Sequence, residues 1–161
     1  MGGASRRFGS PKALARLGGE TLAERAWRRL AWCDERLAVG KGGELELPFP
    51  VLDDGSEERA PAYGLRAALR AARHEVCLVL PVDCPLVTEE ALRRLARDVA
   101  VPQTGPLPGA YARAMLPELE ARLARGELSL RDLNPRTLVL DERLLVNVNT
   151  PADLSALQVD K

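Results

Sequence analysis

The sequence has no long hydrophobic run, no excess of charge of either sign, and only one histidine and three cysteines among its 161 residues. No stretch approaches the roughly 18 apolar residues that a membrane span needs, so we expect a soluble protein without membrane contacts. Lysine plus arginine equals aspartate plus glutamate at 23 each, which leaves no overall field to attract nucleic acid. Any anionic ligand must therefore be held by the charges of a local site.

The cysteines are odd in number, and Cys33, Cys77 and Cys84 show neither a C-x-x-C nor a Cys/His spacing. This pattern argues against a disulfide framework and against a zinc site. It fits a reducing cytoplasm, where we expect the protein to act. The first ten residues carry positive charge without a following apolar stretch, which does not fit a secretory signal.

What the sequence does contain is an ordinary globular balance, with 46% hydrophobic and 29% charged residues. Its length lies within the usual size of one domain, and it shows no internal repeat, low-complexity tract or linker. We therefore predict a single domain over residues 1–161.

Helix signals recur along the chain. Thr21 and Glu24 form a T-x-x-E capping box ahead of apolar residues at helical spacing, which predicts a helix over residues 22–32. Similar spacing, capping residues and first-turn prolines predict further helices. These cover residues 62–73, 88–97, 117–125 and a segment that begins at 150.

Short apolar runs bounded by turn residues predict strands over residues 36–39, 45–52, 75–82 and 144–148. The run E-V-C-L-V-L-P-V at 75–82 is nearly all apolar, as expected for a parallel strand that helices cover on both faces. Because strands and helices alternate, we predict a three-layer α/β fold with a mostly parallel sheet. In such folds ligands bind beyond the carboxyl ends of the strands, so polar residues that follow a strand are candidates for the site.

The glycine-rich start of the chain is the first candidate, with the sequence G-G-A-S-R-R-F-G-S-P-K over residues 2–12. Its glycines allow close approach to phosphates, and Arg7 and Lys12 supply fixed positive charge. The spacing of a Walker loop is absent. A flexible basic N-terminus is the alternative interpretation.

The second candidate is Asp83, which follows the most apolar strand in the segment P-V-D-C-P. A carboxylate there can hold Mg²⁺ and bring the metal to the phosphates of a nucleotide. Alternatively, it is a turn aspartate that satisfies backbone amides.

Asn147 and Asn149 follow the last predicted strand. Their spacing of two places both amides on one face, where they could contact a ribose, a phosphate or a metal-bound water. The alternative is that they cap the helix that follows.

The fourth candidate is the loop that begins at Asp53 and Asp54 and leads to Gly64. A carboxylate in this loop could accept a hydrogen bond from the exocyclic amine of guanine. A solvated surface turn is the alternative.

Taken together, G-G-A-S-R-R-F-G-S-P-K-A-L, L-P-V-D-C-P-L-V and N-V-N-T-P-A-D-L closely resemble molybdenum cofactor guanylyltransferases of the MobA type. Residues 106–133 are also similar to that family, so the match covers almost the whole chain. The three-part combination is specific to the nucleotidyltransferase superfamily. The resemblance implies a Rossmann-like nucleotidyltransferase fold and a reaction in which GTP and molybdopterin give the guanine dinucleotide cofactor and pyrophosphate.

The resemblance also implies a role for each matching residue. The residues that it places at the nucleotide are Gly2, Gly3, Ser5, Arg7, Lys12, Asp54, Gly64, Asp83 and Asn147. Those that it makes catalytic are Arg7, Lys12, Asp83 and Asn149. Arg7 and Lys12 would grip the triphosphate, Asp54 and Gly64 would lie at the nucleoside, and Asp83 would bind Mg²⁺, the expected cofactor. The partners implied are the substrates GTP and molybdopterin, with transient contacts to proteins that supply or accept the cofactor.

The sequence departs from the family at two places. Members normally begin with a hydrophobic strand before the double glycine, whereas Met1 stands here where the last residue of that strand belongs. We therefore expect a native start upstream of Met1, which the intact mass of the native protein would test. Relatives often carry asparagines where this chain has Gly40-Lys41-Gly42, so the family's contact at that point is not predicted here.

Two other functions are open on the sequence. A cytidylyltransferase for the same cofactor, or another enzyme that transfers a nucleotide to a phosphorylated small molecule, tends to carry A-A-G in the loop and D-Q-P after the central strand. Gly2-Gly3 and D-C-P in this chain favour guanine. A non-catalytic cofactor-binding protein is the other alternative, against which the presence of Lys12, Asp83 and Asn149 argues.

Overall fold

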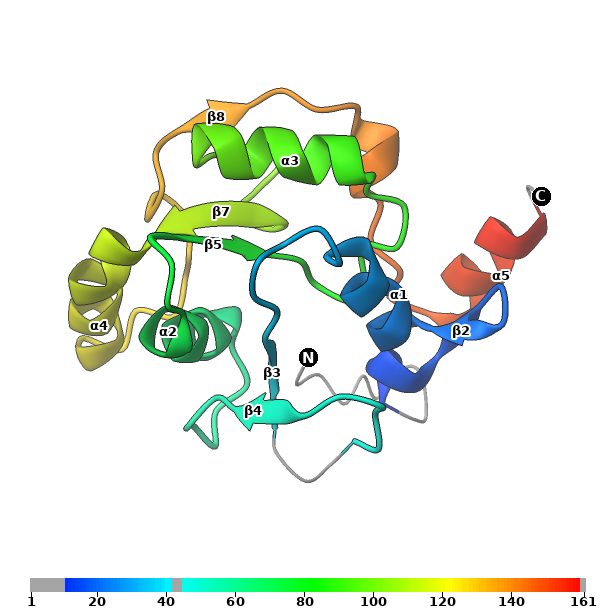
Figure 1. Ribbon diagram of the computed structural model, residues 1–161, viewed down its shortest axis with the longest axis horizontal. Coiled ribbons are helices and arrows are strands. Elements are labelled where there is room, and N and C mark those ends of the chain that lie inside the picture. The colour runs from blue at the N-terminus through cyan, green and yellow to red at the C-terminus, as the bar shows by residue number, and fades with distance from the viewer. Residues whose placement is uncertain (1–10, 42–44, 160–161) are drawn as a thin grey trace.

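The computed structural model describes residues 11–41 and 45–159 of the chain (Figure 1). Its helices are α1 (Leu22–Arg29), α2 (Pro61–Ala71), α3 (Glu89–Asp98), α4 (Leu116–Ala124) and α5 (Pro151–Val159). Its strands are β1 (Arg16–Leu17), β2 (Glu20–Thr21), β3 (Ala38–Gly40), β4 (Val51–Asp53), β5 (Val76–Val79), β6 (Val101–Pro102), β7 (Gly109–Ala112) and β8 (Thr137–Leu138). Short 3-10 turns cover Lys12–Leu14, Arg113–Met115 and Glu142–Leu145.

The strands combine with the helices in the α/β arrangement that the sequence predicts. β3 pairs with β4 in parallel and so does β6 with β8, whereas β5 pairs with β7 and β1 with β2 in antiparallel orientation. The antiparallel course of β7 arises because the chain reverses after β6, where the amide of Gly105 donates to the carbonyl of Pro102 at 3.3 Å.

The predicted helices are found, and their caps explain where they begin. Thr21 Oγ1 accepts from the amide of Glu24 at 3.1 Å, and Glu24 Oε2 accepts from the amide of Thr21 at 2.8 Å, which completes the predicted capping box of α1. Thr88 Oγ1 caps α3 by accepting from the amide of Ala91. No helix within residues 11–41 and 45–159 is long and apolar enough to cross a membrane.

Three layers are formed around the β5–β7 pair: α3 lies on one side, and α2 and α4 lie on the other (Figure 1). On the first side Leu92 and Leu95 of α3 are fully buried and pack with Leu78 of β5. The buried side chains on the second side are Leu65, Leu69, Tyr111 and Leu119. Each such burial contributes roughly 1.5–3 kcal/mol. These two clusters therefore fix β5, whose carboxyl end leads to Asp83.

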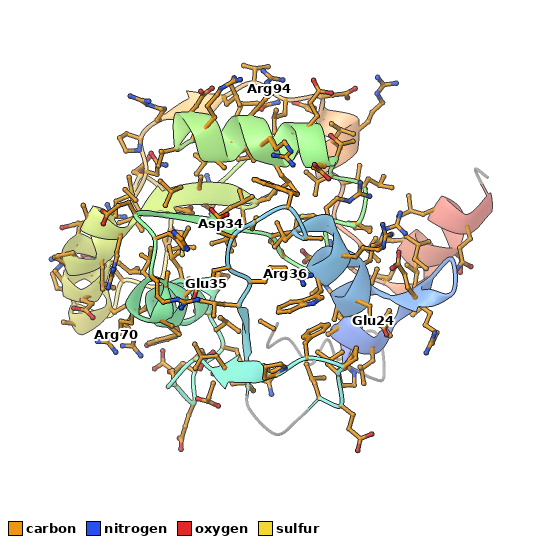
Figure 2. All side chains as sticks on the ribbon, in the orientation of Figure 1. Glu24, Asp34, Glu35, Arg36, Arg70 and Arg94 are labelled. Atoms are coloured by element: carbon orange, nitrogen blue, oxygen red, sulfur yellow. The ribbon has the colours of Figure 1, made fainter. Side chains whose placement is uncertain are left out.

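Several charged side chains point away from these layers. Figure 2 shows Arg94 on the outer side of α3 and Arg70 on the outer side of α2. Glu35 lies between β3 and α2 in Figure 2, and its carboxylate accepts from the backbone amide and from Nε of Arg73 at 3.0 and 3.1 Å. This pair joins the turn before β3 to the end of α2.

Two predicted strands are corrected by the structure. Residues 144–148 were expected to form a strand, but Glu142–Leu145 form a 3-10 turn instead. The cause is local: the Asp141 carboxylate accepts from the amide of Arg143 at 3.0 Å and so caps the turn. The strand expected over 45–52 is shortened to β4, because Pro48 and Pro50 have no amide to donate to a ladder.

Candidate active site

Lys12 contacts two segments that are distant from it in the sequence. Its ammonium donates to Asp83 Oδ2 at 3.4 Å and to Asn149 Oδ1 at 3.2 Å, across separations of 71 and 137 residues. The side chains of Lys12 and Asp83 are 15% and 28% exposed. The structure thus brings together three of the four residues expected to be catalytic, at a place that solvent and ligands can reach.

The turn that carries Asp83 is bound to the segment that carries the asparagines. The amide of Val148 donates to the carbonyl of Asp83 at 2.8 Å. Val148 itself is fully buried and packs with Leu17 and Leu22. Its two neighbours, Asn147 and Asn149, are exposed. Although no strand forms here, the alternation predicted from the spacing of two is present, and both amides reach the rim near Asp83.

Asp153 fixes the backbone at Asn149. Its Oδ2 accepts from the amides of Asn149 and Thr150, both at 2.8 Å, while Thr150 Oγ1 accepts from the amide of Asp153 at 3.1 Å. The hydrogen bond from Asn149 is the main reason that the pKa of Asp153 lies below its ordinary value. Because Thr150 and Asp153 cap α5, the Asn149 side chain is left to interact with Lys12.

Cys84 is a buried neighbour of the same groups, with 3% of its surface exposed. Its Sγ lies 3.0 Å from Asn147 Oδ1 and 3.7 Å from Asp83 Oδ1. Burial, with the adjacent Asp83 charge, raises the pKa of the thiol to about 12. The group is therefore a neutral S–H at physiological pH, able to donate to Asn147 and poorly suited to act as a nucleophile.

Asp54 belongs to a second group of side chains. It is 7% exposed, and its Oδ1 accepts from the Lys41 ammonium at 2.8 Å and from the amide of Ser56 at 3.0 Å. Lys41 also donates to the carbonyls of Ser56 and Glu58. The loop after β4 thus closes around the half-buried ammonium of Lys41, while Gly55, Glu57, Glu58 and Arg59 of the same loop are exposed to solvent.

Gly64 lies in the first half of α2. A Cβ added there would meet only the Val39 side chain, at 4.0 Å, which is ordinary van der Waals contact. Packing in the described part of the chain therefore does not require glycine at this position. The predicted residues Gly2, Gly3, Ser5 and Arg7 lie outside the described residues.

The groups near Lys12 also suit a hard cation that a triphosphate brings with it. Within residues 11–41 and 45–159 no three His, Cys, Asp or Glu side chains gather to form a complete metal cage. Mg²⁺ usually binds through one or two carboxylates, substrate phosphates and water. The Asp83 carboxylate and the neighbouring amide oxygens of Asn147 and Asn149 fit that partial donor set.

This three-layer α/β domain gathers a lysine, a carboxylate and two amides beyond a strand, where ligands of such folds bind. The comparisons with known proteins assign it to the nucleotidyltransferases. Residues 1–138 match the family model of the MobA-like NTP transferase domain. The chain belongs to this family.

Individual relatives agree with this assignment. A protein of Deinococcus radiodurans named "Probable molybdenum cofactor guanylyltransferase" is 36% identical over 173 residues, which cover 97% of this chain and 90% of that protein. Molybdopterin-guanine dinucleotide biosynthesis protein A of Archaeoglobus fulgidus superposes with a TM-score of 0.81 at 23% identity, over 99% of this chain and 94% of that one. A 2-C-methyl-D-erythritol 4-phosphate cytidylyltransferase of Thermus thermophilus gives 0.72 at 21% identity, over 95% and 94%. The predicted Rossmann-like nucleotidyltransferase fold is confirmed.

Sequence reasoning missed three supporting residues. Asp153 carries a readable signal, since T-x-x-D at 150–153 is a capping pattern. Lys41 is one of only three lysines among 23 basic residues, and two of these three lie in the candidate site. Cys84 gives no signal beyond its position next to Asp83, because its contact with Asn147 joins residues 63 positions apart.

Proposed function

We propose that this protein transfers GMP from GTP to the terminal phosphate of molybdopterin, which forms the molybdopterin guanine dinucleotide cofactor and releases pyrophosphate. The observation that carries this proposal is the convergence of Lys12, Asp83 and Asn149 beyond the end of β5. The name of the Deinococcus radiodurans relative supports guanine as the base and the molybdenum cofactor as the product.

The reaction needs two polyanions to be held in line. A phosphate oxygen of molybdopterin attacks the α-phosphorus of GTP, the new P–O bond forms, and the bond to pyrophosphate breaks. Lys12 is suited to neutralise charge on the triphosphate, because its ammonium is partly shielded from water and therefore interacts strongly with an anion. Arg7 would add a second cation. Because molybdopterin itself attacks the α-phosphorus, the proposal involves no covalent enzyme intermediate.

Mg²⁺ is part of the proposal as the cofactor. Asp83 would hold it, with the amide oxygens of Asn147 and Asn149 close by, and the ion would supply positive charge against the transferred phosphoryl group. Asn149 is held in place for this role by Asp153 on its backbone and by Lys12 on its side chain. We further propose that the reaction takes place in the cytoplasm.

The test is incubation of the purified protein with GTP, Mg²⁺ and molybdopterin, followed by detection of the dinucleotide and of pyrophosphate. Parallel reactions contain CTP in place of GTP, or EDTA in place of Mg²⁺. We expect the guanine dinucleotide only with GTP and metal present. A cytosine dinucleotide in preference to the guanine one would instead identify a cytidylyltransferase, and the absence of any product would overturn the proposal.

A further inference from the structure

Lys41 places a half-buried positive charge at the carboxyl end of β3. Its side chain is 11% exposed and is paired with that of Asp54, which is 7% exposed. Removal of two charges from water is costly, and their mutual attraction offsets this cost only when hydrogen bonds satisfy the remaining donors. The two carbonyl contacts of Lys41, from Ser56 and Glu58, supply those bonds.

The contacts of Lys41 use the geometry of an ammonium. Its three N–H donors meet three oxygens that belong to Asp54, Ser56 and Glu58. A guanidinium spreads its donors over a planar fork, whereas the single Nζ of Lys41 meets three oxygens from one point, so an arginine here would need these oxygens to be rearranged. Of the 23 basic residues of the chain, 20 are arginines, and the lysines are Lys12, Lys41 and Lys161. The contacts of Lys41 favour a lysine at this position although the chain otherwise uses arginine.

The loop that Lys41 binds lies at the carboxyl ends of the parallel strand pair β3 and β4. β3 and β4 are parallel and in register from Ala38 opposite Val51 to Gly40 opposite Asp53, so both strands end side by side. Lys41 and Asp54 are the residues that follow these two ends. Ligands of open α/β sheets bind beyond such carboxyl ends. Our inference assigns the triphosphate of GTP to Lys12 and Asp83 and the nucleoside to the loop after β4.

The hydrogen bonds to the Asp54 carboxylate are distributed unevenly between its two oxygens. Within the described part of the chain, the hydrogen bonds to its side chain, from Lys41 and Ser56, all fall on Oδ1. The second oxygen, Oδ2, can then accept from a donor edge of a base. Guanine presents two adjacent donors, its ring N–H and its exocyclic amine, which suits an ionised carboxylate held in one orientation.

We propose that Lys41 is a positioning residue for the nucleoside: it holds the loop 54–58 in the conformation that presents Asp54 to a purine base with two adjacent donors. This inference rests on the proposed function, because it assigns the base end of the GTP site. Lys41 acts through Asp54 and does not itself take part in phosphoryl transfer.

The test compares Lys41→Met with Arg122→Met, which removes a matched cation elsewhere. Arg122 is 18% exposed and likewise binds one carboxylate, that of Glu118, and two backbone carbonyls, those of Arg131 and Asp132. Its helix α4 carries none of the predicted site residues. The readouts are the melting temperature, the Kd for GTP by calorimetry, kcat and KM, and hydrogen exchange at the amides of Gly55 and Ser56.

We expect Lys41→Met to raise the Kd and KM for GTP about 10-fold, as for a weakened charge-assisted hydrogen bond, with kcat changed by less than about 3-fold. Exchange at Gly55 and Ser56 should become faster. Lys41→Arg should restore part of the affinity, and Arg122→Met should lower the melting temperature without changing the Kd. Unchanged GTP affinity in folded Lys41→Met overturns this inference alone. Absence of GTP binding by the unaltered protein overturns both it and the proposed function.

A second pair of variants applies if Lys41→Met does not fold because Asp54 is left as an unpaired buried charge. Asp54→Asn removes that charge and keeps the acceptor for the Ser56 amide. The double variant Lys41→Met/Asp54→Asn is then compared with Asp54→Asn alone. Weaker GTP binding and faster loop exchange in the double variant support the positioning role, and equal values in the two variants overturn it.

Discussion

Lys12 and Asp83 form an ion pair at 3.4 Å, which is longer than the roughly 2.7–2.9 Å of a strong charge-assisted hydrogen bond. Both side chains retain contact with solvent. A pair of this kind adds at most about 1 kcal/mol to stability. The stability of the fold therefore does not explain either charge. When the pair opens, Lys12 is available to bind a phosphate, and Asp83 is available to bind its metal ion.

The first prediction concerns Lys12→Ala. We expect kcat/KM for GTP to fall at least about 10²-fold, as for other preorganised electrostatic contacts, because no other cation in the described part of the chain contacts Asp83 and Asn149. The melting temperature should change little, since the pair is loose. Steady-state kinetics and thermal unfolding measure the two effects. Turnover close to that of the unaltered protein would remove Lys12 from the mechanism.

The second prediction concerns Asp83→Asn and the metal. We expect the Mg²⁺ concentration needed for half-maximal rate to rise and the maximal rate to fall about 10²-fold or more, because the amide keeps the shape of the carboxylate without its charge. In EDTA the variant should bind GTP at least as tightly as the unaltered protein, since one negative charge near the triphosphate is gone. Unaltered Mg²⁺ dependence would show that the metal binds elsewhere or is not used.

The third prediction concerns Cys84. With its thiol pKa raised to about 12 by burial, alkylation by iodoacetamide at pH 8 should label Cys84 last among the three cysteines. Peptide mass spectrometry over time measures the order.

The role of the thiol is tested by two variants. Cys84→Ser keeps a donor for Asn147, and its kcat should stay within about 3-fold of normal, whereas Cys84→Ala loses that donor, and its kcat should fall further. Equal activity of the two variants would show that the thiol does not orient Asn147.

The sequence predicts those parts of the fold that depend on neighbouring residues. Thr21 and Glu24 predict the start of α1 because the two residues of a capping box lie within four positions of each other. The outward placement of Asn147 and Asn149 follows from their spacing around Val148, which must be buried. Both predictions rest on local geometry, and the structure agrees with them.

Other features depend on contacts between distant segments, and the sequence alone does not show them. The strand expected at 144–148 is replaced because Asp141 caps a tighter turn, and this cap competes with an apolar run that is typical of a strand. The approach of Lys12 to Asn149 spans 137 positions. The sequence indicates that the two residues share a site only through the family resemblance, which makes both of them catalytic. Lys41 was missed because the oxygens that surround it come from a loop 13 to 17 residues later.

The last prediction concerns pH and Asp153. Its pKa lies below the ordinary value of 3.8, chiefly through the hydrogen bond from the Asn149 amide, so the folded state favours the ionised form. That stabilisation is present above the unfolded pKa and is lost as pH falls through the lower folded pKa. The melting temperature of Asp153→Ala should therefore lie below that of the unaltered protein at pH 7, and the two melting temperatures should converge under acid conditions below pH 4.

Glu24→Ala is the matched control, because the pKa of Glu24 is also lowered by a capping bond, from Thr21. Its unfolding should show the same convergence, but only Asp153→Ala should lower kcat/KM, because only Asp153 holds Asn149. Equal losses of activity in the two variants would assign Asp153 to helix capping alone.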